Sequence, residues 1–126
     1  MTRRLTPRRP QRGQAVVELA ITLPVVVLLA LVVLQVAVIG RDQLALWHAV
    51  RVAVRSAAVS LEPAADAEVA AQVATTLRPL QVTTDADDEW VRVALQHTSR
   101  TRIAVVGGLV PDVTLHAHAT MRREPP

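Results

Sequence analysis

A long apolar run near the amino terminus dominates the pattern of hydrophobic and polar positions. No charged residue occurs from Leu19 to Gly40. A helix over that stretch would extend about 33 Å, which matches the thickness of the hydrocarbon core of a bilayer. A secretory signal peptide would have a shorter apolar stretch, followed by small residues at a cleavage site. The pattern therefore predicts one transmembrane helix over residues 14–40, with Pro24 free to kink it.

The helical pattern continues beyond the apolar run. The segment from Arg41 to Val59 contains neither Gly nor Pro and is rich in residues that propagate helices, until Pro63 provides a stop. We therefore expect a helical stem over residues 41–62. An apolar stripe at three- and four-residue spacing is expected to be covered by the rest of the chain; it consists of Leu44, Trp47, Val50, Val54 and Ala57.

The remaining residues, 63–126, predict a small domain that combines a short helix with a sheet. Ala64 to Leu77 has an amphipathic pattern that Pro79 ends, and its expected buried face holds Val69, Ala70, Val73, Ala74 and Leu77. Three strands are expected, at Leu80–Thr83, Trp90–Gln96 and Val113–Arg122, the last with strict apolar and polar alternation. Residues 103–110 are ambiguous between a strand and a packed loop. The fold class is α+β, with an antiparallel sheet after the long helix.

The charge distribution separates residues 1–13 from the rest of the chain. This leader holds five arginines and no acidic residue: Arg3, Arg4, Arg8, Arg9 and Arg12. Without it, nine arginines face eleven acidic residues, so the net charge of +3 becomes −2. A nucleic-acid-binding surface is therefore not favoured. The arginine excess instead predicts a protein of the cytoplasmic membrane, with its amino terminus in the cytoplasm and its C-terminal domain on the extracytoplasmic side. The leader can be a targeting peptide or a basic tail that anchors the topology.

Glu18 is the residue that most needs an explanation. A carboxylate near the start of an apolar helix is costly unless a positive charge compensates it. If a peptidase cut between Gly13 and Gln14, the new α-amino group would lie four residues before Glu18. On two helices packed with an axial offset, the ammonium of one chain could pair with the carboxylate of its neighbour and fix their register. A carboxylate held at the level of the lipid headgroups is the alternative.

These residues resemble the signal of type IV pilins and pseudopilins: a short basic leader, a Gly at the cut site, and a Glu five residues beyond it. The segment from Arg12 to Pro24, with the stem from Ala49 to Arg55, is similar to the TadE-like minor pilins of tight-adherence (Tad, Flp-type) pili. The resemblance implies cleavage by a prepilin peptidase and lateral assembly with other pilins and the Tad secretion machinery. It departs from the type IV pilin pattern at Gln14, where those pilins have an aromatic residue that is N-methylated.

Candidate chemistry elsewhere in the chain is weak. His116 and His118 share one face of the last expected strand, and His97 could lie beside them, but exposed polar positions explain them better than a zinc site. The run from Asp85 to Glu89 fits a solvated turn better than a calcium loop. The sequence contains no cysteine and none of the nucleotide-binding, nucleophilic or metalloprotease motifs. We therefore expect no catalytic activity, no cofactor, no metal and no small-molecule substrate.

Two functions from different classes remain at this point. The first is a minor pilin or pseudopilin, inserted in membrane lipid, cleaved by a prepilin peptidase and assembled through its helix into or at the base of a pilus. The second is an uncleaved single-pass membrane protein whose outer domain binds or senses a ligand, with the arginine-rich leader as its topology anchor. The amino-terminal sequence of the mature protein separates the two.

Overall fold

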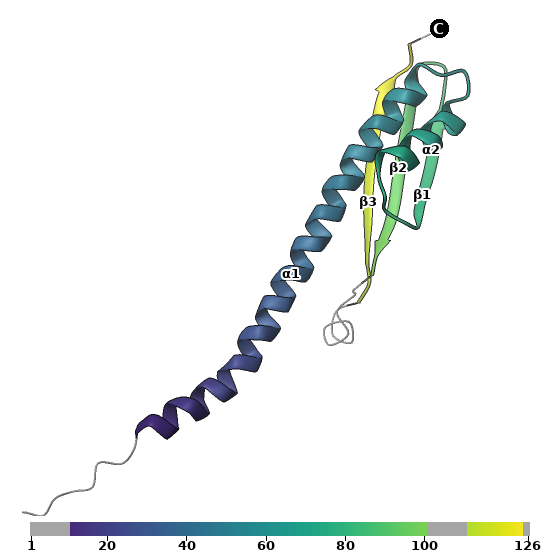
Figure 1. Cartoon of the computed structure of the whole chain (residues 1–126). Helices are drawn as coiled ribbons and strands as arrows, with labels where there is room; N and C mark the ends of the chain where they lie inside the picture. The colour runs from purple at the N-terminus through teal and green to yellow at the C-terminus, as the bar shows by residue number, and fades with distance from the viewer. Residues whose placement is uncertain (1–10, 101–110, 125–126) are drawn as a thin grey trace, which may run out of the picture.

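The computed structural model describes residues 11–100 and 111–124 and forms an α+β fold, as the sequence predicts (Figure 1). Its elements, in chain order, are α1 (Gln11–Ala58), α2 (Pro63–Ala74), β1 (Leu80–Ala86), β2 (Trp90–Ser99) and β3 (Val113–Arg122). The ambiguous segment 103–110 lies outside the described residues. The long helix carries a three-stranded sheet beside its C-terminal half, and α2 lies over the same face of that sheet (Figure 1).

Helix α1 is continuous over 48 residues and ends at Ala58. Pro63 was expected to stop the first helix, but α1 ends before it and Pro63 is the first residue of α2. Proline is tolerated there because the N–H groups in the first turn of a helix have no partner within the helix. The connection between the helices is held by Ser60, whose hydroxyl donates to the carboxylate of Asp66 and accepts the backbone N–H of Glu62. Helix α2 therefore folds back along α1, as its amphipathic pattern predicts.

The sheet is antiparallel with the order β1-β2-β3. Its register places Val82 opposite Leu95, and Leu95 opposite Ala117, so that aliphatic residues of all three strands share one face. Strand β3 has the predicted bounds and the predicted alternation, with Leu115 and Ala117 buried and the residues between them exposed. The sheet therefore presents one apolar face to the helices and one polar face to the outside.

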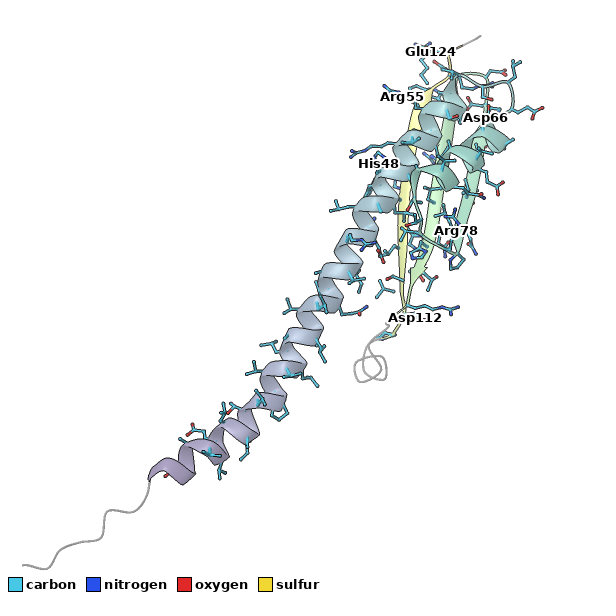
Figure 2. All side chains as sticks on the ribbon, in the orientation of Figure 1. His48, Arg55, Asp66, Arg78, Asp112 and Glu124 are labelled. Atoms are coloured by element: carbon cyan, nitrogen blue, oxygen red, sulfur yellow. The ribbon has the colours of Figure 1, made fainter. Side chains whose placement is uncertain are left out.

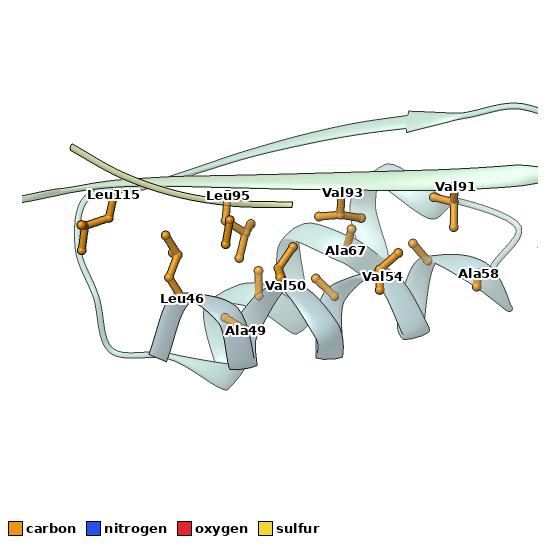
Figure 3. Close-up of a cluster of buried hydrophobic side chains, with 14 residues drawn as sticks. Leu46, Ala49, Val50, Val54, Ala58, Ala67, Val91, Val93, Leu95 and Leu115 are labelled. Carbon is orange, nitrogen blue, oxygen red and sulfur yellow. The ribbon is translucent and has the colours of Figure 1, made fainter. Parts of the chain in front are cut away.

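The core lies between this apolar face and the two helices (Figure 3). Its largest fully buried side chains are aliphatic: Leu46 and Val50 from α1, and Val91, Val93 and Leu95 from β2. Both tryptophans of the chain are partly exposed, Trp47 at 38% and Trp90 at 47%. The core is thus built from Val, Leu and Ala, as the composition requires.

Two details of the predicted amphipathic faces are wrong. On α1, Leu44 is 72% exposed, whereas Leu46, Ala49 and Ala53 are completely buried. The sheet packs on the face that carries the alanines, because small side chains let a strand and a helix approach closely. The predicted members Val50, Val54 and Ala57 lie on that buried face and are correct.

On α2, the buried residues are Ala67 and Ala71, while Val69 and Val73 are 62% and 83% exposed. The same preference for small residues at the contact explains this reversal. The helix also ends at Ala74, before Leu77, because Thr75 adopts an extended backbone conformation at the C-cap. The guanidinium of Arg78 then donates to the backbone carbonyls of Gln72, Thr75 and Leu77, which satisfies the end of the helix.

Candidate functional site

The N-terminal part of α1 holds the residues that the sequence singled out. Gly13, Gln14 and Glu18 lie in the first two turns of the described helix, and all three are exposed. A Cβ atom built on Gly13 would meet nothing within 4 Å. Arg12 lies in the same helix, whereas Arg3, Arg4, Arg8 and Arg9 lie outside the described residues. The helical path places Gln14 and Glu18 one turn apart on nearly the same face.

Glu18 has no salt-bridge partner within residues 11–100 and 111–124. Its backbone carbonyl accepts a hydrogen bond from the hydroxyl of Thr22, one turn further along. Pro24 follows inside the helix and cannot donate to the carbonyl four residues earlier. Among the described residues, the carboxylate of Glu18 is therefore unpaired.

The N-terminal half of α1 is bare of other elements, and its side chains project all round (Figure 2). Leu19, Ile21 and Leu29 are each more than 60% exposed. Within the described residues, one helix is long and apolar enough to cross a membrane, and this segment is its apolar part. Such a surface in water would be strongly unfavourable, so it requires lipid or neighbouring apolar helices around it.

Polar side chains buried on α1 escaped the sequence prediction. Gln35 and Asp42 are only 5% and 8% exposed, and they lie on the same helical face as Leu46. The hydroxyl of Ser99, at the end of β2, donates to the carboxylate of Asp42 at 3.1 Å. The seven-residue spacing of Gln35 and Asp42 is a signal that could have placed them on one face. Together they mark where the sheet meets the end of the apolar segment.

The structure does not bring the three candidate histidines together. His116 and His118 are exposed on the outer face of the sheet. His97 is 6% exposed on the opposite face, and its Nδ1 lies 2.8 Å from the carbonyl oxygen of Pro79. Because a carbonyl only accepts, this nitrogen must donate. In the described parts of the chain no three His, Asp or Glu side chains are grouped so that they could hold a metal ion.

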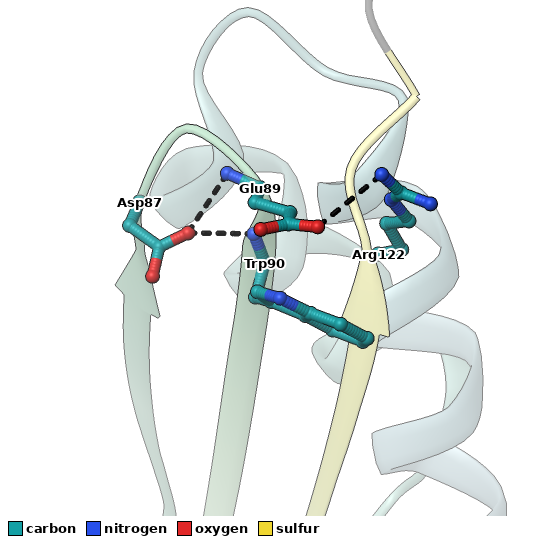
Figure 4. Close-up of polar contacts among 4 residues, drawn as sticks. All are labelled: Asp87, Glu89, Trp90 and Arg122. Carbon is teal, nitrogen blue, oxygen red and sulfur yellow. Dashed lines mark hydrogen bonds and ion pairs between the residues drawn. The ribbon is translucent and has the colours of Figure 1, made fainter.

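The acidic run between β1 and β2 forms a turn (Figure 4). One carboxylate oxygen of Asp87 accepts the backbone N–H groups of Trp90 and Glu89, at 2.6 and 2.9 Å. These hydrogen bonds hold the pKa of Asp87 below its ordinary value, and the nearby Arg123 adds to the effect. Strand β1 includes Asp85, which was expected in the turn, and the expected solvated turn is confirmed at Asp87 to Glu89.

Comparison with known proteins gives a match over the apolar half of α1, which includes Glu18. Residues 13–55 match the family model of the TadE-like proteins. The N-terminal part of the chain is TadE-like. The match begins at Gly13, includes Glu18 and the whole apolar segment, and ends at Arg55 on the packed half of α1. The sheet and α2 lie outside the matched region. No protein of curated function and no solved structure matches the chain.

The match covers about a third of the chain and includes the apolar part of α1. Among the described residues this helix is the one that is long and apolar enough to cross a membrane. The similarity to TadE-like proteins therefore concerns the candidate membrane-spanning segment and the start of the packed half of α1.

Proposed function

We propose that this chain is a minor pilin or pseudopilin that a prepilin peptidase cuts after Gly13, and that then assembles through α1 into or at the base of a Tad pilus. The observation that carries the proposal is the place of Gly13 and Glu18 in the TadE-like region. The family match starts at Gly13, and Glu18 follows it with a carboxylate that has no partner among the described residues. The protein has no enzymatic activity of its own in this proposal.

Nothing among the described residues requires a glycine at position 13, which supports the proposal that a processing enzyme requires it. A glycine inside a helix costs about 1 kcal/mol relative to alanine, so its presence needs a reason. Neither a close neighbour nor a positive φ angle supplies that reason. A peptidase that admits only a small side chain beside its catalytic carboxylates would supply it. Gly40 is equally unobstructed, so the spacing to Glu18 distinguishes the cut site from the second glycine.

Assembly follows from the two halves of α1. None of the described elements covers the apolar half, whereas the sheet and α2 pack on the other half. Neighbouring pilins can therefore pack along the apolar half, with the α+β domain outside the cytoplasmic membrane. The ammonium of Gln14 in one chain and Glu18 of another would form an ion pair of low exposure, which fixes the axial offset. The leader arginines hold the amino terminus in the cytoplasm before cleavage.

The test is the amino-terminal sequence of the full chain, co-expressed with a Tad prepilin peptidase and purified from membranes. Recovery of Gln14 as the first residue supports the proposal. The variant Gly13→Val should remain uncut and retain the arginine leader. Its matched control is Gly40→Val, which adds the same side chain to an equally open glycine of the same helix. Recovery of Met1 or Thr2 from the natural chain would refute the proposal and favour an uncleaved membrane receptor.

A further inference from the structure

A cavity of about 670 Å³ lies where the lower end of the sheet meets α1. Its walls come from three places: α1 around Gln35 and Asp42, the connection that holds Arg78, and the end of β2 from His97 to Arg100. Leu34 and Val38 form its apolar part. This volume is in the range of cavities that bind small molecules or the headgroup of a lipid.

The amide of Gln35 is the first indication of a ligand. The residue is 5% exposed, and its Nε2 has no hydrogen-bond partner among residues 11–100 and 111–124. Buried side-chain amides in folded proteins nearly always have an acceptor, because an unpaired one costs free energy. Since Gln35 lines the cavity, a rotation of its side chain would bring the buried amide to an acceptor that enters there.

The charges around the cavity indicate what kind of ligand it would take. Arg41 and Arg100 line it and have no acceptor in the described parts of the chain, whereas Arg78 is already bonded to backbone carbonyls. The buried Asp42 has only the hydroxyl of Ser99 as a partner. Among the described residues, two arginines without an acceptor and one carboxylate with a single hydrogen bond line the same cavity, which fits a molecule that carries both a phosphate and an ammonium group.

The position of the cavity along α1 points to a lipid. The uncharged run that begins at Leu19 ends at Gly40, five residues or about 8 Å of helix beyond Gln35. Arg41 then lies at the level of the headgroups, and Gln35 lies within two helical turns of it. The bare aliphatic surface below it, which includes Val33 at 61% exposure, gives acyl chains a surface to follow. A headgroup could enter the cavity while its tails remain in the bilayer.

We propose that this cavity binds the headgroup of a phospholipid with a primary ammonium, a phosphoethanolamine lipid. The phosphate accepts hydrogen bonds from Gln35, Arg41 and Arg100, and the ammonium donates to Asp42. The bound lipid ties the sheet to the membrane surface and orients the domain. The proposal requires that α1 spans the membrane and is independent of cleavage at Gly13.

The experiment uses the full chain in a mild detergent, with bound lipid counted by native mass spectrometry. The probes are phosphatidylethanolamine, phosphatidylglycerol and free O-phosphoethanolamine. The natural chain should retain phosphatidylethanolamine in preference to phosphatidylglycerol, and should bind free O-phosphoethanolamine much more weakly. Gln35→Leu should weaken retention about tenfold, because it removes a hydrogen bond to a charged group. Asp42→Asn should keep the Ser99 hydrogen bond and abolish the preference between the two lipids.

Gln72→Leu is the matched control, since Gln72 is exposed on α2 and does not line the cavity. Urea unfolding distinguishes lost binding from a lost fold: Gln35→Leu should unfold at an equal or higher urea concentration, because it replaces an unpaired buried amide. Equal retention of phosphatidylethanolamine by the natural chain and Gln35→Leu would overturn the proposal. So would equal retention of both lipids by the natural chain, or binding of free O-phosphoethanolamine as tight as that of the lipid.

Discussion

Leu46 gives the sharpest test of how the sheet packs on α1. Its side chain is completely buried and points into the core near Leu95 and Leu115 (Figure 3). The change Leu46→Ala removes three carbon atoms, which costs about 2.4 kcal/mol of transfer free energy. The cavity that remains raises the cost to about 3–4 kcal/mol. A domain of this size has a free energy of unfolding of only about 4–10 kcal/mol, so the loss is a large part of it.

The assay is urea unfolding of the full chain in detergent, followed by the fluorescence of Trp47 and Trp90. With an m-value of about 1 kcal/mol per molar urea, the midpoint should fall by about 3 M. Leu44→Ala is the control: the same substitution two residues away, at a side chain that is 72% exposed, should shift the midpoint by less than about 0.5 M. If Leu44→Ala is as damaging as Leu46→Ala, the sheet packs on the other face of the helix and the reasoning fails.

Two further predictions concern charged groups. Glu18→Val should insert into membranes at least as well as the natural chain but be lost from the purified pilus fraction, whereas Thr22→Val should be retained; normal incorporation of Glu18→Val would contradict the pairing mechanism. For Asp87, the lowered pKa means that its ionised form stabilises the fold fully above the ordinary value of 3.8, and that this contribution disappears as pH falls through the lower folded value. Asp87→Asn should therefore reduce the fall in urea midpoint between pH 6 and pH 3, while Asp88→Asn, whose side chain makes no hydrogen bond among the described residues, should leave that fall unchanged.

Elements with strong periodicity could be predicted from the sequence. The bounds of β3 are those expected, because its apolar and polar residues alternate without exception from Val113 to Met121. Strands β1 and β2 are longer than expected, since each continues into polar residues. Asp85 of β1 pairs with Arg92, and Ser99 of β2 pairs with Val113. Backbone hydrogen bonding to a neighbour extends these strands beyond the end of their apolar pattern, and a single sequence does not contain that information.

The buried face of α1 could not be chosen from periodicity alone. Leu44 and Leu46 lie on different sides of the helix, and both sides carry aliphatic residues. The buried side is the one whose alanines allow the sheet to approach the helix most closely. How closely it approaches depends on the shapes of both the sheet and the helix, and not on the helix sequence alone. For the same reason Gln35 and Asp42 could not be assigned to the interior. The candidate residues Gly13 and Glu18, in contrast, are predicted from spacing alone, because the proposed cleavage and ion pairing depend only on positions within one helix.

The domain is attached along the side of α1 and not at its end, and this has a geometric consequence. The backbone N–H of Glu124 donates to the carbonyl of Ala58, so the last described residue of the chain lies beside the C-terminal end of α1, at the end opposite to the apolar segment (Figure 1). A reporter fused after Glu124 would therefore begin at that end of the molecule. If several subunits pack through the apolar segments of α1, the domain on the side of each helix must point away from the bundle axis. The width of the domain then limits how many copies can surround that axis.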